Sequence, residues 1–261
     1  MRLLRKDLEN INARLETQSP QEILGWVAAT FGPRAAILSS MQKAGTALCH
    51  MAEQAGKTFD VLFVDTGVLH QETLMTRDLL ARSHRHLRVI TLSPAQSFAE
   101  QTRELGLLYL SREGQEQCCD LRKTAPLHGV RGRYDVFVSG LRRQEGKARS
   151  RIGMIELDEA MGALRVHPLA NWSADDLERY LASHAGAVVN PLHHMGFPTI
   201  GCFTCTTPVR PDEPERAGRW RHLAGVDYCG INPTDRSPAN EASIDLDERY
   251  RAALSLGPPA S

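Results

Sequence analysis

The sequence has no net charge, because 31 lysines and arginines balance 31 aspartates and glutamates over 261 residues. Proteins that bind nucleic acid as their main ligand usually carry a cationic surface, so the composition does not support that class of function. The sequence also lacks a run of 18 apolar residues that could span a membrane, and its first residues are charged, without the apolar region of a signal peptide. We see no internal repeat. We therefore expect a soluble cytoplasmic protein with no nucleic-acid or membrane partner.

Disulfide bonds are rare in the cytoplasm, so the six cysteines are not expected to be structural cross-links. Cys49 lies on the apolar side of a predicted helix in TALCHMA, and we interpret it as an ordinary buried thiol. The remaining cysteines require a chemical role. They are Cys118, Cys119, Cys202, Cys205 and Cys229.

Short apolar runs alternate with helical patterns through the first half of the chain. The runs occupy residues 35–38, 60–64, 87–92 and 135–139. Strands that alternate with helices are typical of βαβ units, so we predict an α/β protein with a mainly parallel sheet. Residues 152–167 differ, because two alternating runs flank a turn at Gly162 and predict an antiparallel hairpin.

Helix signals flank these strands. The first thirty residues read as two helices, and Ser19-Pro20 supplies the N-cap and first turn of the second. Ser173 should cap a helix in SADDLERYLASH. From about residue 206 the composition becomes rich in proline, arginine and glycine, which predicts a loosely held C-terminal region with a short helix near LDERYRAAL.

Three loops should meet at the carboxyl ends of the parallel strands, where open α/β sheets bind ligands. SSMQKAGT (39–46) leads into a helix whose first amides could hold an anion, DTG (65–67) follows the second strand, and residues 139–151 contain five basic side chains. Together they predict a site for a nucleotide or a similar anion. The first two loops supply the candidate binding residues Ser39, Ser40, Gln42, Lys43, Asp65, Thr66 and Gly67.

The spacing of four cysteines favours a metal centre. Cys202-Phe-Thr-Cys205 is a C-x-x-C pair, and Cys118-Cys119 brings the number of thiolates to four, enough for tetrahedral zinc or a [4Fe–4S] cluster. A redox dithiol would leave the adjacent pair unexplained. Neighbouring thiolates would crowd one zinc ion but can each bind a different iron of a cubane, so the spacing favours the cluster. Arg122 and Lys123 would stabilise its negative charge.

Four motifs together resemble the iron–sulfur-cluster-containing branch of the assimilatory adenylyl-sulfate (APS) reductases, within the APS/PAPS reductase family. They are CCDLRKTAPL, SGLRR, NPLHHMGFPTIGCFTC and ERAGRW…YCGIN, and the likeness runs from about residue 35 to 232. The resemblance implies a doubly wound, mainly parallel sheet of the adenine nucleotide α-hydrolase-like type with a flexible C-terminal segment. We accordingly expect a nucleotide-binding domain over residues 1–205, with the cluster cysteines, and a mobile segment over 206–261, with the catalytic cysteine.

The resemblance also implies roles for individual residues. Cys229 matches the family nucleophile, and Lys123 matches a lysine between cluster and substrate. The predicted cluster ligands are Cys118, Cys119, Cys202 and Cys205. The arginines expected to hold the phosphosulfate end are Arg142, Arg216 and Arg219.

The closing motif departs from the family pattern. Tyr228 and Asn232 stand where the family has glutamate and histidine, so Asn232 can donate a hydrogen bond to a substrate anion but carries no charge. Turnover or affinity could differ as a result. The chain also continues for 29 residues beyond Asn232, where many relatives stop.

The expected function is thiol-dependent reduction of APS to sulfite and AMP in sulfate assimilation and cysteine biosynthesis. Cys229 would form an S-sulfocysteine intermediate, and thioredoxin or glutaredoxin would supply the electrons. The sequence leaves open whether the protein is a homo-oligomer.

Three alternatives stay open at this stage. The substrate could be 3′-phosphorylated APS (PAPS), because Lys43 could pair with the extra phosphate. An ATP-using thiolation enzyme would need a Ser-Gly-Gly-x-Asp-Ser loop, which SSMQKAGT is not. A non-enzymatic metal or cluster sensor would leave the arginine loops and Cys229 without a role. His193 and His194 could ligate a metal, but we interpret them as loop residues near the C-x-x-C.

Overall fold

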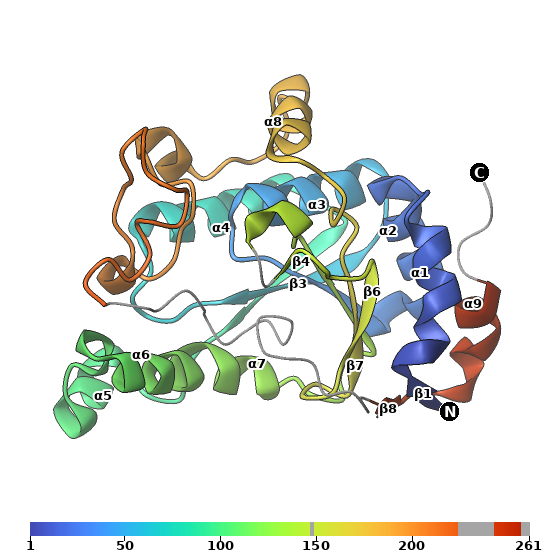
Figure 1. Cartoon of the computed structure of the whole chain (residues 1–261), viewed down its shortest axis with the longest axis horizontal. Helices are drawn as coiled ribbons and strands as arrows, with labels where there is room; N and C mark the ends of the chain where they lie inside the picture. The colour runs from blue at the N-terminus through green and yellow to red at the C-terminus, as the bar shows by residue number, and fades with distance from the viewer. Residues whose placement is uncertain (147–148, 224–242, 257–261) are drawn as a thin grey trace.

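The computed structural model describes residues 1–146, 149–223 and 243–256. Its centre is a six-stranded sheet with the strand order β4-β3-β2-β5-β7-β6 (Figure 1). All neighbouring strands are parallel except β6, which runs antiparallel to β7. The strands are β2 (Ala35–Leu38), β3 (Phe59–Val64), β4 (Leu87–Leu92), β5 (Val136–Ser139), β6 (Ile155–Asp158) and β7 (Ala163–Val166).

This sheet confirms the predicted α/β class, the four predicted parallel strands and the predicted hairpin. The hairpin turn contains Gly162, whose φ of 63° lies in the left-handed region that favours glycine. β6 and β7 pair from Ile155↔Val166 to Asp158↔Ala163, which adds an antiparallel edge to the parallel sheet.

Side chains alternate between the two faces of the sheet, as the pleat requires. Ile37 and Val138 belong to the large core under α2 and α3, whereas Ala36 and Phe137 belong to a smaller core on the opposite face. Helices cover both faces: α3 and α4 lie on one side, and α6 and α7 lie on the other (Figure 1). The two apolar faces explain why the strands read as nearly continuous apolar runs.

The helices in the described part of the chain are α1 (Glu9–Leu15), α2 (Pro20–Phe31), α3 (Lys43–Gln54), α4 (Gln71–Ser83), α5 (Phe98–Leu105), α6 (Arg112–Cys119), α7 (Ala125–His128), α8 (Ala174–Ser183) and α9 (Arg251–Leu256). Two predicted N-caps are confirmed. The Ser19 hydroxyl accepts from the Glu22 amide at the start of α2, and the Ser173 hydroxyl accepts from the Asp176 amide at the start of α8.

The C-terminal stretch returns to the start of the chain. β8 (Ser243–Asp245) pairs with β1 (Arg2–Leu4) in an antiparallel two-stranded sheet, and α9 packs beside α1. The predicted short helix near LDERYRAAL is therefore present as a 3₁₀ turn (Glu248–Tyr250) followed by α9. The division at residue 205 and the mobility of the segment after it stay predictions, but residues 243–256 pack against the N-terminal elements.

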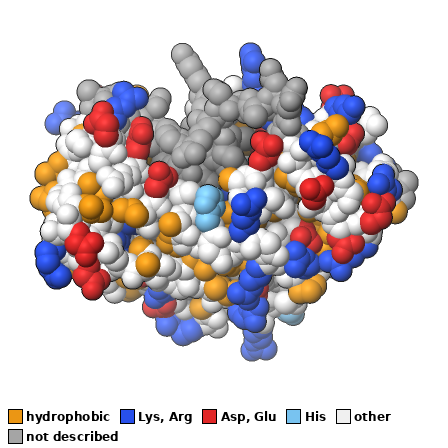
Figure 2. Space-filling model, turned by 90° about the horizontal axis from the view of Figure 1, so that it is seen from below, with side chains coloured by type: hydrophobic (Ala, Val, Ile, Leu, Met, Phe, Trp, Pro, Cys, Tyr) orange, Lys and Arg blue, Asp and Glu red, His pale blue; other side chains and the backbone are white. Residues whose placement is uncertain are grey.

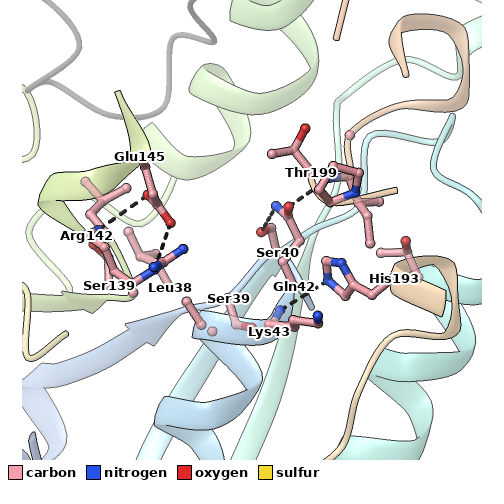
Figure 3. Close-up of a pocket in the computed structure, with 18 of the residues that line it drawn as sticks. Leu38, Ser39, Ser40, Gln42, Lys43, Ser139, Arg142, Glu145, His193 and Thr199 are labelled. Carbon is pink, nitrogen blue, oxygen red and sulfur yellow. Dashed lines mark hydrogen bonds and ion pairs between the residues drawn. The ribbon is translucent and has the colours of Figure 1, made fainter. Parts of the chain in front are cut away.

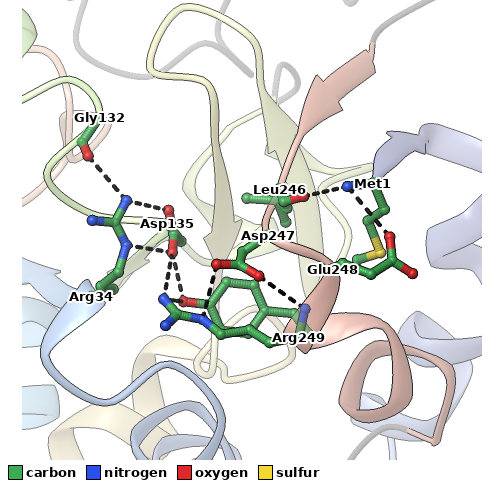
Figure 4. Close-up of polar contacts among 9 residues, drawn as sticks. Met1, Arg34, Gly132, Asp135, Leu246, Asp247, Glu248 and Arg249 are labelled. Carbon is green, nitrogen blue, oxygen red and sulfur yellow. Dashed lines mark hydrogen bonds and ion pairs between the residues drawn. The ribbon is translucent and has the colours of Figure 1, made fainter.

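Polar contacts reinforce this junction (Figure 4). Asp135 accepts hydrogen bonds from the Arg34 Nε at 2.5 Å and from the Tyr250 hydroxyl at 2.6 Å, and Arg249 lies 3.8 Å from the same carboxylate. The amino group of Met1 donates to the Leu246 carbonyl at 2.5 Å. The contacts of Asp135 join the residue before β5 to the 3₁₀ turn before α9, and the Met1 bond joins the first residue to the residue after β8.

Figure 2 shows acidic and basic side chains interspersed over the face seen there, in keeping with the balanced composition. Among the described residues, no helix has both the length and the apolar character needed to cross a membrane.

Candidate active site

A pocket of about 330 Å³ opens at the carboxyl ends of the parallel strands (Figure 3). Ser39 follows β2, Thr66 follows β3 and Ser139 ends β5, so three adjacent strands each deliver a polar side chain to its lining. The position is the one that the loop signals predict for an open α/β sheet.

The loop after β2 wraps tightly into α3. The Ser39 hydroxyl accepts from the Met41 amide at 3.2 Å, and Met41 has a left-handed φ of 57°. A Cβ on Gly45 would lie only 2.6 Å from the Ser39 hydroxyl, so this turn needs glycine there. Gln42 joins the loop to the C-x-x-C segment, because its amide oxygen accepts from the Ile200 N–H at 2.8 Å.

Lys43 lines the pocket and already has two partners there. Its ammonium forms an ion pair with Glu178 on α8, and its backbone N–H donates to the His193 Nε2 at 3.4 Å. The His193 Nδ1 therefore carries the proton and donates to the Phe197 carbonyl at 2.8 Å. Burial, with the nearby positive charge of Lys43, lowers the pKa of His193 to about 4, so this ring is neutral at pH 7.

Arg142 has guanidinium N–H groups that make no hydrogen bond in the described part of the chain. Its side chain is 9% exposed, and its Nε lies 3.5 Å from the Glu145 carboxylate, which also pairs with Arg149 at 2.7 Å. Within the described part of the chain, the Arg142 Nη1 is buried and has no hydrogen-bond partner. A buried N–H that is left unpaired costs free energy, so this group favours a ligand that can accept a hydrogen bond.

Arg219 approaches the pocket from the segment after the C-x-x-C. Its guanidinium lies 4.3 Å from the centre of the Trp220 ring, and a Cβ on Gly201 would come within 2.7 Å of it, so Gly201 makes room for the arginine. The Thr206↔Arg219 bridge holds this segment against the C-x-x-C loop. The Nε of Arg219 is buried without a hydrogen-bond partner among residues 1–146, 149–223 and 243–256.

The pocket brings together nine of the predicted substrate-binding residues. They are Ser39, Ser40, Gln42, Lys43, Thr66, Lys123, Arg142, Arg216 and Arg219. Asp65 and Gly67 do not line it: Asp65 accepts from the Gly67 amide at 2.9 Å and faces Arg77 at 3.9 Å. Cys229 and Asn232 lie outside the described residues.

The four predicted metal ligands line one small cavity next to the pocket. Cys118 and Cys119 reach it from the end of α6, and Cys202 and Cys205 reach it from the C-x-x-C turn. Lys123 lines both this cavity and the pocket, so it lies between them. No disulfide joins any cysteine in the described part of the chain.

A π-helical turn, Asp120–Thr124, follows the two adjacent cysteines directly. Such turns are rare and often occur at functional sites. Here the turn buries both Arg122 and Lys123. The Arg122 guanidinium donates to the Thr66 carbonyl and, at 3.0 Å, to the Gln101 side chain, which ties the cysteine cavity to the loop after β3.

Burial raises the pKa of the Cys118 and Cys205 thiols, and the neighbouring Cys202 acts in the same direction. The positive charge of Lys123 lowers both values in part. Among the described residues, no three or more His, Cys, Asp or Glu side chains converge as a single metal ion requires. Four thiols around one cavity, with buried cations beside them, nevertheless match the donor set of a cluster, whose sulfurs bind separate irons.

Several lining residues were not predicted from the sequence. They are Ser139, Glu145, Arg149, Glu178, His193 and Glu215. Arg149 lies in the basic loop that was predicted to bind an anion, and His193 was interpreted only as a neighbour of the C-x-x-C. Glu178 had no local signal, because it lies on the predicted helix after Ser173, whose contact with Lys43 is set by the tertiary fold.

Comparison with known proteins identifies the family of the chain. Residues 34–208 match the family described as "Phosphoadenosine phosphosulfate reductase domain". The chain is 38% identical over 224 residues to an "Adenosine 5'-phosphosulfate reductase" of Streptomyces coelicolor, covering 86% of this chain and 92% of the relative. It is 32% identical over 210 residues to "Adenosine 5'-phosphosulfate reductase 1" of Bacillus subtilis, covering 80% and 89%.

A crystal structure of phosphoadenylyl-sulfate (PAPS) reductase from Candida auris, in a phosphate complex, has a similar fold, with a TM-score of 0.67 and 23% identity. The match covers 78% of this chain and 98% of that one. The fold, the position of the pocket and the sequence matches over most of the chain lead to one conclusion: this chain belongs to the phosphoadenosine phosphosulfate reductase domain family.

Proposed function

We propose that this protein reduces adenosine 5′-phosphosulfate to sulfite and AMP, with a dithiol protein as electron donor, in sulfate assimilation and cysteine biosynthesis. The observation that carries the proposal is the meeting of nine predicted substrate-binding residues in one pocket, with Lys123 shared between that pocket and the cysteine cavity. The curated relatives with the same printed activity support it.

The reaction has two stages, transfer of the sulfonate to Cys229 and release of sulfite by the dithiol donor. The Cys229 thiolate attacks the sulfate sulfur, an S–S bond forms, and the bond from sulfur to the phosphate oxygen breaks, which releases AMP. A thiolate of thioredoxin or glutaredoxin then attacks the Cys229 sulfur and releases sulfite, and its second thiol completes a disulfide on the donor. The donor supplies both electrons.

The cationic side chains hold and neutralise the phosphosulfate. Arg142, Arg216 and Arg219 line the pocket, and the buried N–H groups of Arg142 and Arg219 that have no partner in the described chain are suited to donate hydrogen bonds to anionic oxygens. Lys123 stabilises negative charge that develops on the transferred sulfonate and the leaving phosphate. Asn232 contributes a hydrogen bond to the same anion. Ser39, Ser40, Gln42 and Thr66 contact the nucleotide directly, whereas Asp65 and Gly67 shape the loop beside it.

Cys118, Cys119, Cys202 and Cys205 would hold a [4Fe–4S] cluster. When bound, the cluster would supply an electrostatic influence on the adjacent Lys123 and on the substrate anion. The residues fit this group because all four thiols line one cavity and Arg122 and Lys123 are buried next to it. We further propose that the protein works in the cytoplasm; its oligomeric state does not enter the mechanism.

The experiment is an assay of anaerobically purified protein with APS or PAPS and thioredoxin. We expect sulfite from APS with the higher kcat/KM. Without a donor, APS should add about 80 Da, one SO₃ unit, to Cys229 and not to a Cys229→Ser variant. Sulfite formation by Cys229→Ser at near the unaltered rate would disprove the nucleophile.

PAPS is the second candidate substrate. Lys43, the residue that could meet the extra phosphate, is paired with Glu178, and this pairing favours APS. A higher kcat/KM for PAPS, reduced in Lys43→Ala, would reverse the assignment. A colourless protein that forms no sulfite from either nucleotide would favour the sensor alternative.

A further inference from the structure

Three side chains from adjacent strands form a chain of contacts beneath the pocket. The Ser139 hydroxyl at the end of β5 lies 2.8 Å from the Nδ1 of His167, and the Nε2 of His167 faces the Glu156 carboxylate at 3.4 Å. His167 follows β7, and Glu156 belongs to β6. Ser139 also lines the pocket beside Arg142 (Figure 3), so this chain of contacts ends at the pocket.

The atoms that face one another in these contacts are buried. The His167 side chain is 1% exposed. Its Nε2 and the Glu156 Oε2 are both buried, and neither has a hydrogen-bond partner among the described residues. The other carboxylate oxygen of Glu156 accepts from the Gly153 amide at 3.2 Å. The 3.4 Å contact between this ring nitrogen and the carboxylate is therefore an electrostatic contact and not a hydrogen bond.

The electrostatics determine which nitrogen carries the proton. A carboxylate can only accept, so Glu156 favours the proton of His167 on Nε2. The neighbouring charges are Arg143, which lies near Glu156, and Arg165, its cross-strand partner, whose own guanidinium donates to Asp158 at 2.6 Å. The His167 Nδ1 is then an acceptor, and the Ser139 hydroxyl must donate to it.

A hydroxyl that has donated its one proton can only accept from a further partner. We propose that Glu156 and His167 orient Ser139 as a hydrogen-bond acceptor toward the pocket, so that Ser139 selects nucleotides that present a neutral N–H or O–H donor at this point. This inference rests on the proposed function, in which the ligand is an adenosine 5′-phosphate derivative. Its three neutral donor groups are the 2′-hydroxyl, the 3′-hydroxyl and the 6-amino group.

Calorimetric binding of AMP and of three analogues to the full chain tests this role. The analogues are 2′-deoxy-AMP, 3′-deoxy-AMP and IMP, which each lack one donor. The unaltered protein should bind one of them about 2- to 12-fold more weakly than AMP, the range for one neutral hydrogen bond. Ser139→Ala should bind AMP and that analogue equally well.

Two substitutions of His167 separate orientation from folding. His167→Leu should lose the same discrimination as Ser139→Ala. His167→Asn should retain it, because the amide oxygen can take the place of Nδ1 as acceptor. Ser83→Ala is the matched control, since the Ser83 hydroxyl lies 2.8 Å from the Nδ1 of His84, away from the pocket; it should leave the discrimination intact. The binding of AMP and its analogues to the unaltered protein tests the selectivity even if a variant does not fold.

The outcomes are distinct. Equal discrimination by the unaltered protein and Ser139→Ala against all three analogues overturns the inference but leaves the proposed function standing. No binding of any adenine nucleotide overturns both. Covalent labelling of Ser139 by a fluorophosphonate probe would identify a nucleophile instead of a fixed acceptor, and would also overturn it.

Discussion

The two ends of the parallel sheet use charge in opposite ways. At the amino ends of the strands, Asp60 accepts two hydrogen bonds of 2.8 Å from Arg88 and one of 2.7 Å from the Tyr134 hydroxyl, and Asp135 accepts from Arg34 and Tyr250. At the carboxyl ends, Arg142 keeps a buried N–H group without a partner in the described chain.

This difference separates charges that stabilise the fold from charges that bind the substrate under the proposed function. Asp60 and Asp135 each accept three hydrogen bonds, so these carboxylates contribute to the native state and have little capacity left to bind anything else. A buried arginine with an unused donor lowers stability slightly and gains that free energy back when an anion binds. The comparison can be tested by substitutions at each end.

The largest effect should come from the cysteine cavity beside the carboxyl ends. Changing Cys119 to Ser should abolish the brown colour and the broad absorbance expected near 400 nm, together with sulfite formation, because one thiolate ligand is lost. Absorbance and iron content of anaerobically purified protein measure this. Cys49→Ala is the control, since that thiol is buried in the core under α3 and should leave the colour unchanged. Tightly bound zinc in the unaltered protein would refute the cluster.

Arg142→Ala should come next in size. Removing the guanidinium should raise KM for APS by about 10- to 100-fold, the range for one or two charge-assisted hydrogen bonds, while the melting temperature stays the same or rises. Steady-state kinetics and thermal unfolding give the two values. Arg88→Ala, at the amino ends, should leave KM unaltered; a similar rise in KM there would break the comparison.

Asp135→Asn should lower stability and leave KM unchanged, the reverse of Arg142→Ala. It leaves Arg34 without a charged partner in a half-buried network, so we expect a loss of about 2–3 kcal/mol in the free energy of unfolding and no change in KM. Urea unfolding measures the loss. Asp245→Asn on β8 is the control, because that carboxylate is exposed and its change should cost under about 0.5 kcal/mol. A large rise in KM for Asp135→Asn would mean that the amino ends also serve the substrate.

The smallest effect should be a dependence of stability on acid. Burial alone would raise the pKa of Asp60 and Asp135, but hydrogen bonds from arginine and tyrosine and the nearby positive charges outweigh it and lower both values. The folded-state pKa then lies below the unfolded one, so the stabilisation is complete above the unfolded pKa and is lost as pH falls through the folded pKa. Melting temperatures from pH 6 to pH 2 should show this loss. Asp135→Asn should flatten part of it; an identical profile would contradict the assignment.

Local patterns predicted the parts of this fold that depend on neighbouring residues. Apolar runs predicted β2 to β5, and alternating apolar and polar residues predicted the hairpin of β6 and β7. Ser19 and Ser173 predicted the starts of two helices. β1 was not predicted, because three residues carry no period and the partner strand lies about 240 positions away. The π-helical turn after Cys119 was also not predicted, because its residues carry no pattern that distinguishes a π-helix from an α-helix.

The candidate site divides in the same manner. The positions of Ser39, Thr66 and Arg142 follow from the rule that loops at the carboxyl ends of parallel strands meet. The pairing of Lys43 with Glu178 could not be predicted, because it depends on how α8 packs across α3. Similarly, the contact between Ser139 and His167 needs the register of β5 against β7, which places Val138 opposite Val166.

The pairing of β1 with β8 affects the order in which the protein can fold during synthesis. The partner strand of residues 2–4, at 243–245, is synthesised roughly 12 to 50 s after them, at about 5–20 residues per second. The six-stranded sheet is complete at Val166, so the central core can form before that time. The two-stranded sheet can then form only after the central core. A nascent chain stalled before Ser243 should contain the central sheet, with β1 unpaired because β8 has not been synthesised.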